Sequence, residues 1–426
     1  MKVLLISANT EKINMPTLPL GLASVAAATK KAGHEVAQLD LMFEEDTRLV
    51  VKEAIEGFNP DVIGISVRNI DDQNMENPRF LLKPVRGIIA DCRSLSGAPV
   101  VLGGAGYSIF PESALSYLGA DMGIQGEGEV AFPALLERLE QHGELSGLPG
   151  LYLSGRASQD KRNFTKNLDD LSFPDNYLWS PSDFHNQELW IPIQSRRGCP
   201  LHCSYCSTAT IEGGAIRRRS PEFVVQEIAR LVDAGYNYFY FVDNTFNFPR
   251  SYAMEICRLI LTVRLNITWR CILYPLHVDR ELVESMAKAG CREVSLGFES
   301  GSERILSLMN KKFKPEDVRQ ISGMLAEQGI RQMGFLLLGG PGETKETIEE
   351  SLNFADSLKL DLLKITMGIR IYPYTSVAKI SMDEGFISCH DDLLLPRFYL
   401  ARGLEDWLPE TLKDWMAARP HWMSQV

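Results

Sequence analysis

The segment Ser195-Arg196-Arg197-Gly198-Cys199-Pro200-Leu201-His202-Cys203-Ser204-Tyr205-Cys206 places three thiols in one short loop. Thiolates are soft ligands, and clustered cysteines select zinc, copper(I) or an iron–sulfur cluster. A structural zinc site needs four ligands, usually two C-x-x-C pairs or one pair with two histidines. No second such pair follows in this chain. Three thiolates on a cubane 4Fe–4S cluster would leave one iron open, where a substrate or cofactor could bind.

The spacing C-x-x-x-C-x-x-C, with Tyr205 directly before Cys206, resembles the signature of the radical S-adenosylmethionine (SAM) enzymes. The resemblance implies that Cys199, Cys203 and Cys206 hold a 4Fe–4S cluster whose open iron chelates the amino and carboxylate groups of SAM. An external one-electron donor, such as a flavodoxin or a ferredoxin, would reduce the cluster, which then cleaves SAM to methionine and a 5′-deoxyadenosyl radical. The alternative is three incidental cysteines in a reducing cytosol, one of them buried as a small hydrophobic residue.

With 426 residues, of which 45% are hydrophobic and 23% charged, the chain has the composition of a globular protein of two or three domains. Its net charge of −11 argues against a nucleic-acid partner. Eight cysteines in so long a chain favour a reduced compartment over a disulfide scaffold. The start, Met1-Lys2-Val3-Leu4-Leu5-Ile6, predicts a strand and not a signal peptide. No apolar run approaches the ~20 residues of a membrane helix, so we expect a cytoplasmic protein without a membrane span.

The first third of the chain alternates strand-like and helical patterns. This alternation predicts a parallel, doubly wound α/β domain over residues 1–141, and five strands suit the Rossmann-like, flavodoxin-type order. Ligands of such sheets bind beyond the carboxyl ends of the strands, at the topological switch point. Residues 142–190, rich in Pro and Gly, are the expected connector, with one short strand-like run at Gly150–Leu153. The predicted strands are Val3–Ser7, Glu35–Leu39, Val62–Val67, Pro99–Leu102 and Met122–Ile124, and the predicted helices are Leu20–Lys31, Arg48–Gly57, Leu82–Asp91 and Val130–Gln141.

Glycine- and hydroxyl-rich segments follow these strands. Gly103-Gly104-Ala105-Gly106 lacks G-x-G-x-x-G spacing and is not a dinucleotide fingerprint. Together, and placed before the cysteine loop, the segments resemble the cobalamin-binding domain of the cobalamin-dependent radical SAM family. The chain lacks the D-x-H-x-x-G loop whose histidine ligates cobalt in many cobalamin proteins. The absence of this loop is usual in the cobalamin-dependent radical SAM family. The alternative interpretation is that the N-terminal domain binds no cobalamin and serves as a scaffold. The resemblance implies cobalamin contacts from Thr17, Leu20, Ser66, Arg68, Asn69, Gly103, Gly104, Gly106, Gly126, Glu127 and Gly128.

From Ile191 the strand–helix alternation resumes. Its six units resemble the partial (β/α)6, TIM-like barrel of radical SAM enzymes over residues 191–375, followed by a short, aromatic-rich helical cap at 376–426. Function in such barrels gathers at the carboxyl ends of the strands, where the cysteine loop also lies. Arg217-Arg218-Arg219 are expected to be a solvated approach to the next helix; the alternative is that one arginine reaches an acidic substrate. The predicted strands are Ile191–Ser195, Tyr238–Val242, Thr268–Leu273, Glu293–Phe298, Gln332–Leu338 and Leu362–Ile371, and the predicted helices are Pro221–Ala234, Arg250–Leu265, Arg280–Ala289, Pro315–Gln328 and Lys345–Leu358.

Polar residues and glycines at the other strand ends are candidates for SAM binding. A carboxylate such as Glu299, in a run that resembles the family's G-x-E-S-G, can accept bonds from the amine or the ribose of SAM. A guanidinium such as Arg270 can bind the SAM carboxylate, or instead form an internal salt bridge of the barrel. No catalytic residue is assigned. The full candidate set for SAM is Tyr205, Asp243, Arg270, Glu299 and Gly340.

The resemblance covers about residues 1–375 and implies a cobalamin-dependent radical SAM enzyme. The commonest reaction of that family is methylation of an unactivated carbon or, less often, phosphorus, with methylcobalamin as methyl donor and the deoxyadenosyl radical as hydrogen abstractor. Two alternatives stay open: a non-methylating reaction such as anaerobic cyclisation or ring contraction, and a non-catalytic cobalamin or redox sensor. Methylthio transfer to tRNA would need further N-terminal cysteines and a basic RNA-binding domain, which the sequence lacks. No pattern identifies the substrate, which could be a small molecule or a peptide.

Overall fold

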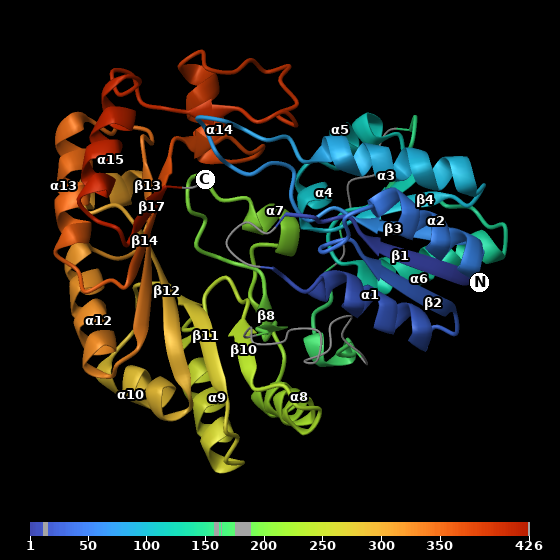
Figure 1. Cartoon of the computed structure of the whole chain (residues 1–426), viewed down its shortest axis with the longest axis horizontal. Helices are drawn as coiled ribbons and strands as arrows, with labels where there is room; N and C mark the ends of the chain where they lie inside the picture. The colour runs from blue at the N-terminus through green and yellow to red at the C-terminus, as the bar shows by residue number, and fades with distance from the viewer. Residues whose placement is uncertain (12–15, 157–161, 163, 175–188, 425–426) are drawn as a thin grey trace.

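A computed structural model describes residues 1–11, 16–156, 162, 164–174 and 189–424. Parts of the expected connector, residues 157–161, 163 and 175–188, therefore lie outside the described residues. Two α/β bodies lie side by side: an N-terminal sheet with its helices, and a larger open barrel (Figure 1). The short helix α7 (Thr208–Glu212), which follows the cysteine loop, lies between them.

The N-terminal sheet has the predicted flavodoxin-like order, β2-β1-β3-β4-β5, in which all neighbours are parallel. A sixth strand pairs antiparallel with β5 and confirms the short run expected near residue 151. The strand order reverses between β1 and β3, which makes this the topological switch point. The strands are β1 (Lys2–Ser7), β2 (Glu35–Asp40), β3 (Val62–Ser66), β4 (Val100–Gly103), β5 (Met122–Ile124) and β6 (Leu151–Leu153).

Helices cover both faces of this sheet, as its continuous apolar strands require. Side chains such as Val3 and Leu5 of β1 pack with α1 and α6, whereas Leu4 and Ile6 belong to the core under α2 and α3. Two short helices that the sequence pattern does not indicate follow β4; Gly104 is the N-cap of the first and Phe110 that of the second. The helices are α1 (Leu20–Lys31), α2 (Thr47–Phe58), α3 (Leu82–Leu95), α4 (Ala105–Ile109), α5 (Pro111–Leu118) and α6 (Gly128–Glu140).

The barrel sheet is parallel throughout, in the order β17-β14-β13-β12-β11-β10-β7. Its six predicted strands are confirmed. The seventh, β17 (Trp422–Ser424), comes from the C-terminal segment. The others are β7 (Ile191–Ile193), β10 (Tyr238–Phe241), β11 (Thr268–Leu273), β12 (Cys291–Glu299), β13 (Arg331–Leu338) and β14 (Leu362–Met367), with helices α8 (Pro221–Asp233), α9 (Arg250–Thr262), α10 (Arg280–Lys288), α12 (Pro315–Glu327) and α13 (Lys345–Asp356) on the outside.

Side chains alternate between the two faces of the barrel sheet. On β11, Trp269 is fully buried on the helix side, whereas Arg270 is partly exposed and faces the barrel interior. On β13, Gln332 donates to the carbonyl of Ser322 in α12 at 3.0 Å, which identifies the helix-facing side. Phe335 therefore lies on the interior side. The interior positions are those from which side chains can reach a ligand.

Capping residues set several helix ends where the sequence predicts them. The Ser220 side chain accepts the N–H of Phe223 at the start of α8. Gly235, Gly290 and Gly329 follow their helices with φ of +95°, +97° and +67°, a conformation that favours glycine. None of the described helices is long and apolar enough to cross a lipid bilayer.

The C-terminal segment is less helical than expected. Its helices are α14 (Ser376–Asp383) and α15 (Trp407–Ala417), but β17 extends the barrel sheet at the edge of β14. The rings of Trp415 and Trp422 stack at 5.6 Å and hold α15 against β17. The strand predicted to run to Ile371 breaks at Gly368, whose φ of +72° interrupts the pleat before β15 (Ile369–Arg370).

Candidate functional site

The cysteine loop is held at the carboxyl end of the barrel by backbone hydrogen bonds. It lies between β8 (Arg196–Arg197) and α7. The N–H of Cys199 donates to the carbonyl of Gly213 at 3.1 Å, and the N–H of Ser204 donates to the carbonyl of Met309 at 3.0 Å. The loop is therefore tied both to the segment after α7 and to the segment after β12.

The three sulfurs fit an iron–sulfur cluster by their chemistry. Cys199, Cys203 and Cys206 are free thiols. Burial raises the pKa of Cys199 to about 11, and a bound metal would favour the thiolate form that ligates it. Among the described residues, no three His, Cys, Asp or Glu side chains are grouped as ligands of a single metal ion. A cubane does not require that grouping, because each thiolate binds a different iron.

Asp243, a predicted SAM ligand, binds the segment that leads into the cysteine loop. It follows β10 and is 1% exposed. Its carboxylate accepts the N–H of Ser195 at 2.8 Å, the hydroxyl of Ser195 at 2.6 Å and the N–H of Arg196 at 3.0 Å. Burial raises the pKa of Asp243, although Arg196 and these hydrogen bonds act to lower it. The geometry gives Asp243 a role in fixing the loop, and its contact with SAM stays a prediction.

Two predicted SAM ligands, Tyr205 and Glu299, meet beside the cysteine loop. The Tyr205 hydroxyl donates to Glu299 Oε1 at 2.9 Å. The ammonium of Lys311 donates to the Tyr205 oxygen at 2.9 Å and to Glu299 Oε1 at 3.2 Å. Glu299 has a φ of +62°, a conformation that costs a non-glycine residue on the order of 1–2 kcal/mol. Its carboxylate is thus held in place at the price of backbone strain.

Lys311 is a site residue that no motif in the sequence indicates. Its side chain is 4% exposed. Burial acts to lower its pKa, but Glu299 and Tyr205 outweigh burial and raise the pKa well above its usual value, so the ammonium stays charged. Lys311 lies 12 residues after Glu299, in a Lys-Lys pair that could equally be an exposed turn. Only the approach of that turn to the end of β12 reveals its role.

Arg270 lies inside the barrel and forms an internal salt bridge, which was the predicted alternative to SAM binding. It pairs with Glu293 on the neighbouring strand at 3.4 Å. Its guanidinium lies 4.2 Å from the ring centre of Trp190 and 4.8 Å from that of Tyr240. These contacts fix Arg270 as part of the barrel wall, and its contact with SAM stays a prediction.

Gly340 lies in the turn after β13, where Glu343 caps the backbone. The N–H groups of Gly339 and Gly340 both donate to Glu343 Oε2, the second at 2.7 Å. A Cβ at Gly340 would lie 2.8 Å from the terminal methyl of Ile369, so a larger residue would require that side chain to shift. Glu343 is 5% exposed, and burial raises its pKa to about 7 although the two N–H groups act to lower it.

This raised pKa predicts a pH-dependent stability. Between the unfolded pKa of about 4.3 and the folded value, the folded state binds more protons than the unfolded state, so the free energy of unfolding falls as the pH rises. We expect Glu343→Gln to remove about 3 kcal/mol of this fall between about pH 4.5 and about pH 7. Urea unfolding across this range measures the effect. The same pH slope in wild type and variant would contradict it.

The predicted cobalamin site lies at the carboxyl edge of the N-terminal sheet, where β1 and β3 diverge. A small cavity of about 20 Å³ opens there, and Asn9, Arg68 and Asn69 are among its lining residues. Asn9 is 8% exposed, and its Nδ2 has no hydrogen-bond partner among the described residues. Arg68 is exposed at this edge, although partial desolvation of its guanidinium lowers its pKa. An unsatisfied amide beside an exposed cation fits a large polar ligand lying over this edge.

The glycines of this edge have two different roles. A Cβ at Gly103 would meet no atom within 4 Å, so this position is open toward a ligand. Gly104 has a φ of +100°, and a Cβ there would collide with the backbone of Val67. A Cβ at Gly106 would lie 2.9 Å from the carbonyl oxygen of Arg68. Gly104 and Gly106 are thus required for α4 to begin against the end of β3.

The other predicted cobalamin residues lie along the same edge. Ser66 ends β3, and Gly126 follows β5. Thr17 and Leu20 lie before and at the start of α1. Gly128 begins α6, where a Cβ would lie 2.8 Å from Val25 of α1. Their contacts with cobalamin stay predictions.

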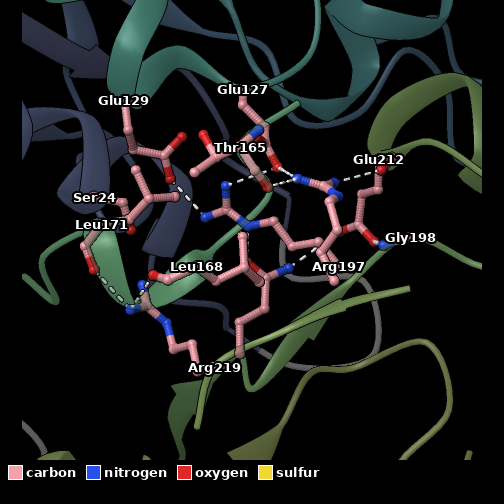
Figure 2. A network of polar contacts seen from close by, with 12 residues as sticks. Ser24, Glu127, Glu129, Thr165, Leu168, Leu171, Arg197, Gly198, Glu212 and Arg219 are labelled. Carbon is pink, nitrogen blue, oxygen red and sulfur yellow. Dashed lines mark hydrogen bonds and ion pairs between the residues drawn. The ribbon is translucent and has the colours of Figure 1, made fainter. Parts of the chain in front are cut away.

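A buried polar network joins the N-terminal domain to the segment before the cysteine loop (Figure 2). Arg197, two residues before Cys199, donates to Glu129 Oε1 at 2.6 Å and pairs with Glu127 at 3.2 Å. Arg217 binds Glu127 as well. The side chains of these four residues are at most 10% exposed. Burial acts to raise the pKa of Glu129, but Arg197 outweighs burial and lowers it, so the pair is ionised.

The connector and the barrel contribute to the same network. The N–H of Thr165 donates to Glu127 Oε2 at 2.8 Å. Arg219 donates to the carbonyls of Leu168 and Leu171 at 2.7 and 2.6 Å. The expectation of a solvated arginine run is therefore wrong for Arg217 and Arg219, because backbone carbonyls and carboxylates of another domain replace water around them. The carboxylate of Glu127, predicted to bind cobalamin, is engaged in this joint.

A second joint involves the loop after β3. Asp71 pairs with Arg370 at 2.7 Å, and the two side chains are 1% and 3% exposed. Arg370 also donates to the carbonyl of Leu393, and Gln73 donates to the hydroxyl of Tyr372 at 2.9 Å. Both joints start from the carboxyl edge of the N-terminal sheet, after β3 and after β5. That edge therefore faces the barrel.

Protein-family models match the two bodies separately. A B12 binding domain model matches residues 6–136, and a Radical SAM superfamily model matches residues 193–355. The chain therefore contains a B12-binding domain followed by a radical SAM domain. The cofactor of the first domain type is cobalamin, and those of the second are SAM and a 4Fe–4S cluster.

Known proteins resemble the chain over most of its length. The uncharacterized methyltransferase PH0819 of Pyrococcus horikoshii is 28% identical over 392 residues, which cover 88% of this chain and 83% of that protein. Cytidylyl-2-hydroxyethylphosphonate methyltransferase of Streptomyces wedmorensis is 28% identical, over 83% of this chain and 77% of that protein. The structure of the radical SAM methyltransferase TsrM from Kitasatospora setae, with cobalamin and a [4Fe-4S] cluster bound, superposes with a TM-score of 0.89 at 23% identity, over 99% of this chain and 92% of that chain. The fold is therefore shared across both domains.

Proposed function

We propose that this chain is a cobalamin-dependent radical SAM methyltransferase, which moves a methyl group to an unactivated carbon or phosphorus atom of its substrate. The observation that carries the proposal is the joint of Figure 2, which ties the segment before three free thiols to the carboxyl edge of the B12-binding domain. The same substrate atom must lose its hydrogen and receive the methyl group, so the two cofactor sites must be held in a fixed position relative to each other. Relatives that match over most of the chain are named methyltransferases.

On the barrel side, Cys199, Cys203 and Cys206 would hold the cluster. Glu299 would accept a hydrogen bond from the amine or a ribose hydroxyl of SAM, and Tyr205 would lie beside it. When bound, the cofactors supply the radical and methyl-transfer chemistry of this enzyme class.

On the other side, the edge of the N-terminal sheet would bind cobalamin. Asn9 and Arg68 offer hydrogen-bond donors there, and Gly103 leaves the backbone open. No histidine precedes His34, so the loop after β1 would offer no imidazole to a bound cobalamin. The buried joints on this edge would keep water away from the space between the domains.

The proposal includes a cytoplasmic location and an external one-electron donor such as a flavodoxin or a ferredoxin. The cysteines of the chain are free, which suits a reduced compartment.

Anaerobic reconstitution with iron, sulfide and hydroxocobalamin tests the proposal. We expect about four irons and about one cobalamin per wild-type chain. Cys203→Ala should lose the cluster, because two thiolates remain, and should keep cobalamin. Cys389→Ala, at an exposed cysteine outside the loop, should keep both. Absorbance with iron and cobalt quantitation measures the outcome.

A cluster without cobalamin would contradict the methyl-transfer proposal and leave the N-terminal domain as a scaffold. Methyl-labelled SAM in a cell extract distinguishes methylation from cyclisation. Methylation transfers the label to a substrate molecule, whereas cyclisation leaves the label on the products of SAM.

A further inference from the structure

The barrel interior contains a cation that the site described so far does not use. Lys364 lies on β14 between Leu363 and Ile365, which are 0% and 1% exposed on the helix-facing side. Alternation along the strand turns Lys364 toward the barrel interior, where it is partly exposed. Its register neighbours are Phe335 on β13 and Met423 on β17, so its stem lies between apolar side chains.

No described residue forms an ion pair or a hydrogen bond with the ammonium of Lys364. Burial lowers its pKa, and no charged side chain compensates. The other interior cations are paired, Arg270 with Glu293 and Lys311 with Glu299. A partly buried ammonium without a partner is unfavourable, because it loses hydration and gains no anion in return. The ammonium of Lys364 is therefore suited to bind an anion that comes from outside the described part of the chain.

Lys364 also lies near the place where SAM and a substrate would meet. Its register neighbour Phe335 lies opposite Gly297 of β12, and Glu299 is two residues further along that strand. Two strand spacings of ~4.8 Å and one two-residue step of ~6.6 Å put the Cα atoms of Lys364 and Glu299 on the order of 12 Å apart. A small molecule fits between two side chains at that separation.

We propose that Lys364 binds an oxyanion of the substrate, a carboxylate or a phosphate-type group, and that this enzyme therefore acts on an acidic small molecule. The inference rests on the proposed function, because that function places the substrate inside the barrel. The partly buried ring of Phe335 strengthens a charge pair beside it by lowering the local dielectric. SAM is the competing source of a carboxylate, but Lys364 lies two strands away from Glu299.

Matched anionic and neutral probes test this inference by calorimetry on the reconstituted protein with SAM. We expect benzoate or phenylphosphonate to bind wild type at least about tenfold more tightly than benzamide. Lys364→Met should abolish this preference, whereas Lys364→Arg should keep it. Lys359→Met, at an exposed lysine before β14, is the matched control and should keep it too. The two anions distinguish a carboxylate from a phosphate-type group.

Equal affinity of wild type for anionic and neutral probes, including no measurable binding of either, would overturn the inference. So would an unchanged preference in Lys364→Met. Weaker SAM binding in that variant would assign the anion to SAM instead of the substrate. Iron and cobalamin are quantified in the same samples. Protein that cannot be loaded with cofactors contradicts the proposed function, whereas loaded protein without an anion preference contradicts only the substrate class.

Discussion

Arg197→Met is expected to lower the free energy of unfolding at neutral pH by about 3–5 kcal/mol, because breaking a buried ion pair leaves a charge without its partner. Glu129 loses its 2.6 Å bond from Arg197. Glu127 is less affected, since it keeps Arg217 and the N–H of Thr165. Methionine fills most of the volume of the arginine stem, so the change reports mainly on charge. Urea unfolding at neutral pH measures the loss.

The loss should shrink in acid. Arg197 outweighs burial and holds the pKa of Glu129 below its usual value, so the stabilisation is present above the unfolded pKa and disappears as the pH falls through the folded pKa. At neutral pH, adding Glu129→Gln to Arg197→Met should recover part of the stability, because no buried charge is then left. Arg280→Met, which breaks an exposed pair with Glu327, should change little. An equally unstable double variant would show that packing, and not charge, explains the loss.

The elements that the sequence predicts well are those whose pattern is local. The order of the N-terminal sheet and the six barrel strands follow from alternating apolar runs and helix caps, because each run carries its own periodicity. Trp422–Ser424 is too short to carry one, so its addition to the barrel as β17 depends on the edge of β14, far away in sequence. The break at Gly368 is equally non-local, since a Cβ there would collide with Met75 of the other domain.

The same distinction applies to the site. The cysteine cluster and the position of Glu299 at a strand end can be predicted from the sequence, because each lies within one short segment. The joint between the domains is not, since Glu129 and Arg197 are 68 residues apart and each alone resembles a solvated surface residue. Lys364 is hidden for the opposite reason. An isolated lysine in a strand gives no signal until the neighbouring strands show that it faces inward without a partner.

Glu299→Gln is expected to weaken SAM binding by roughly 10- to 100-fold, because a charge-assisted hydrogen bond to the amine or ribose of SAM becomes a neutral one. Glutamine keeps the shape of the side chain and the backbone φ of +62°, so the strain of this position is the same in both proteins. Calorimetric titration of the cluster-loaded protein with SAM, under anaerobic conditions, measures the change. Unchanged SAM affinity would remove Glu299 from the SAM site.

A companion double variant separates binding from folding. Glu299→Gln alone leaves the ammonium of Lys311, 4% exposed, without its carboxylate and should destabilise the protein. Lys311→Met added to Glu299→Gln removes both charges, so stability should return toward that of wild type while SAM binding stays weak. If SAM affinity instead returned together with stability, Glu299 would act by holding the end of β12 and not by contacting SAM. Stability recovers without SAM affinity only if the strained carboxylate of Glu299 contacts the ligand.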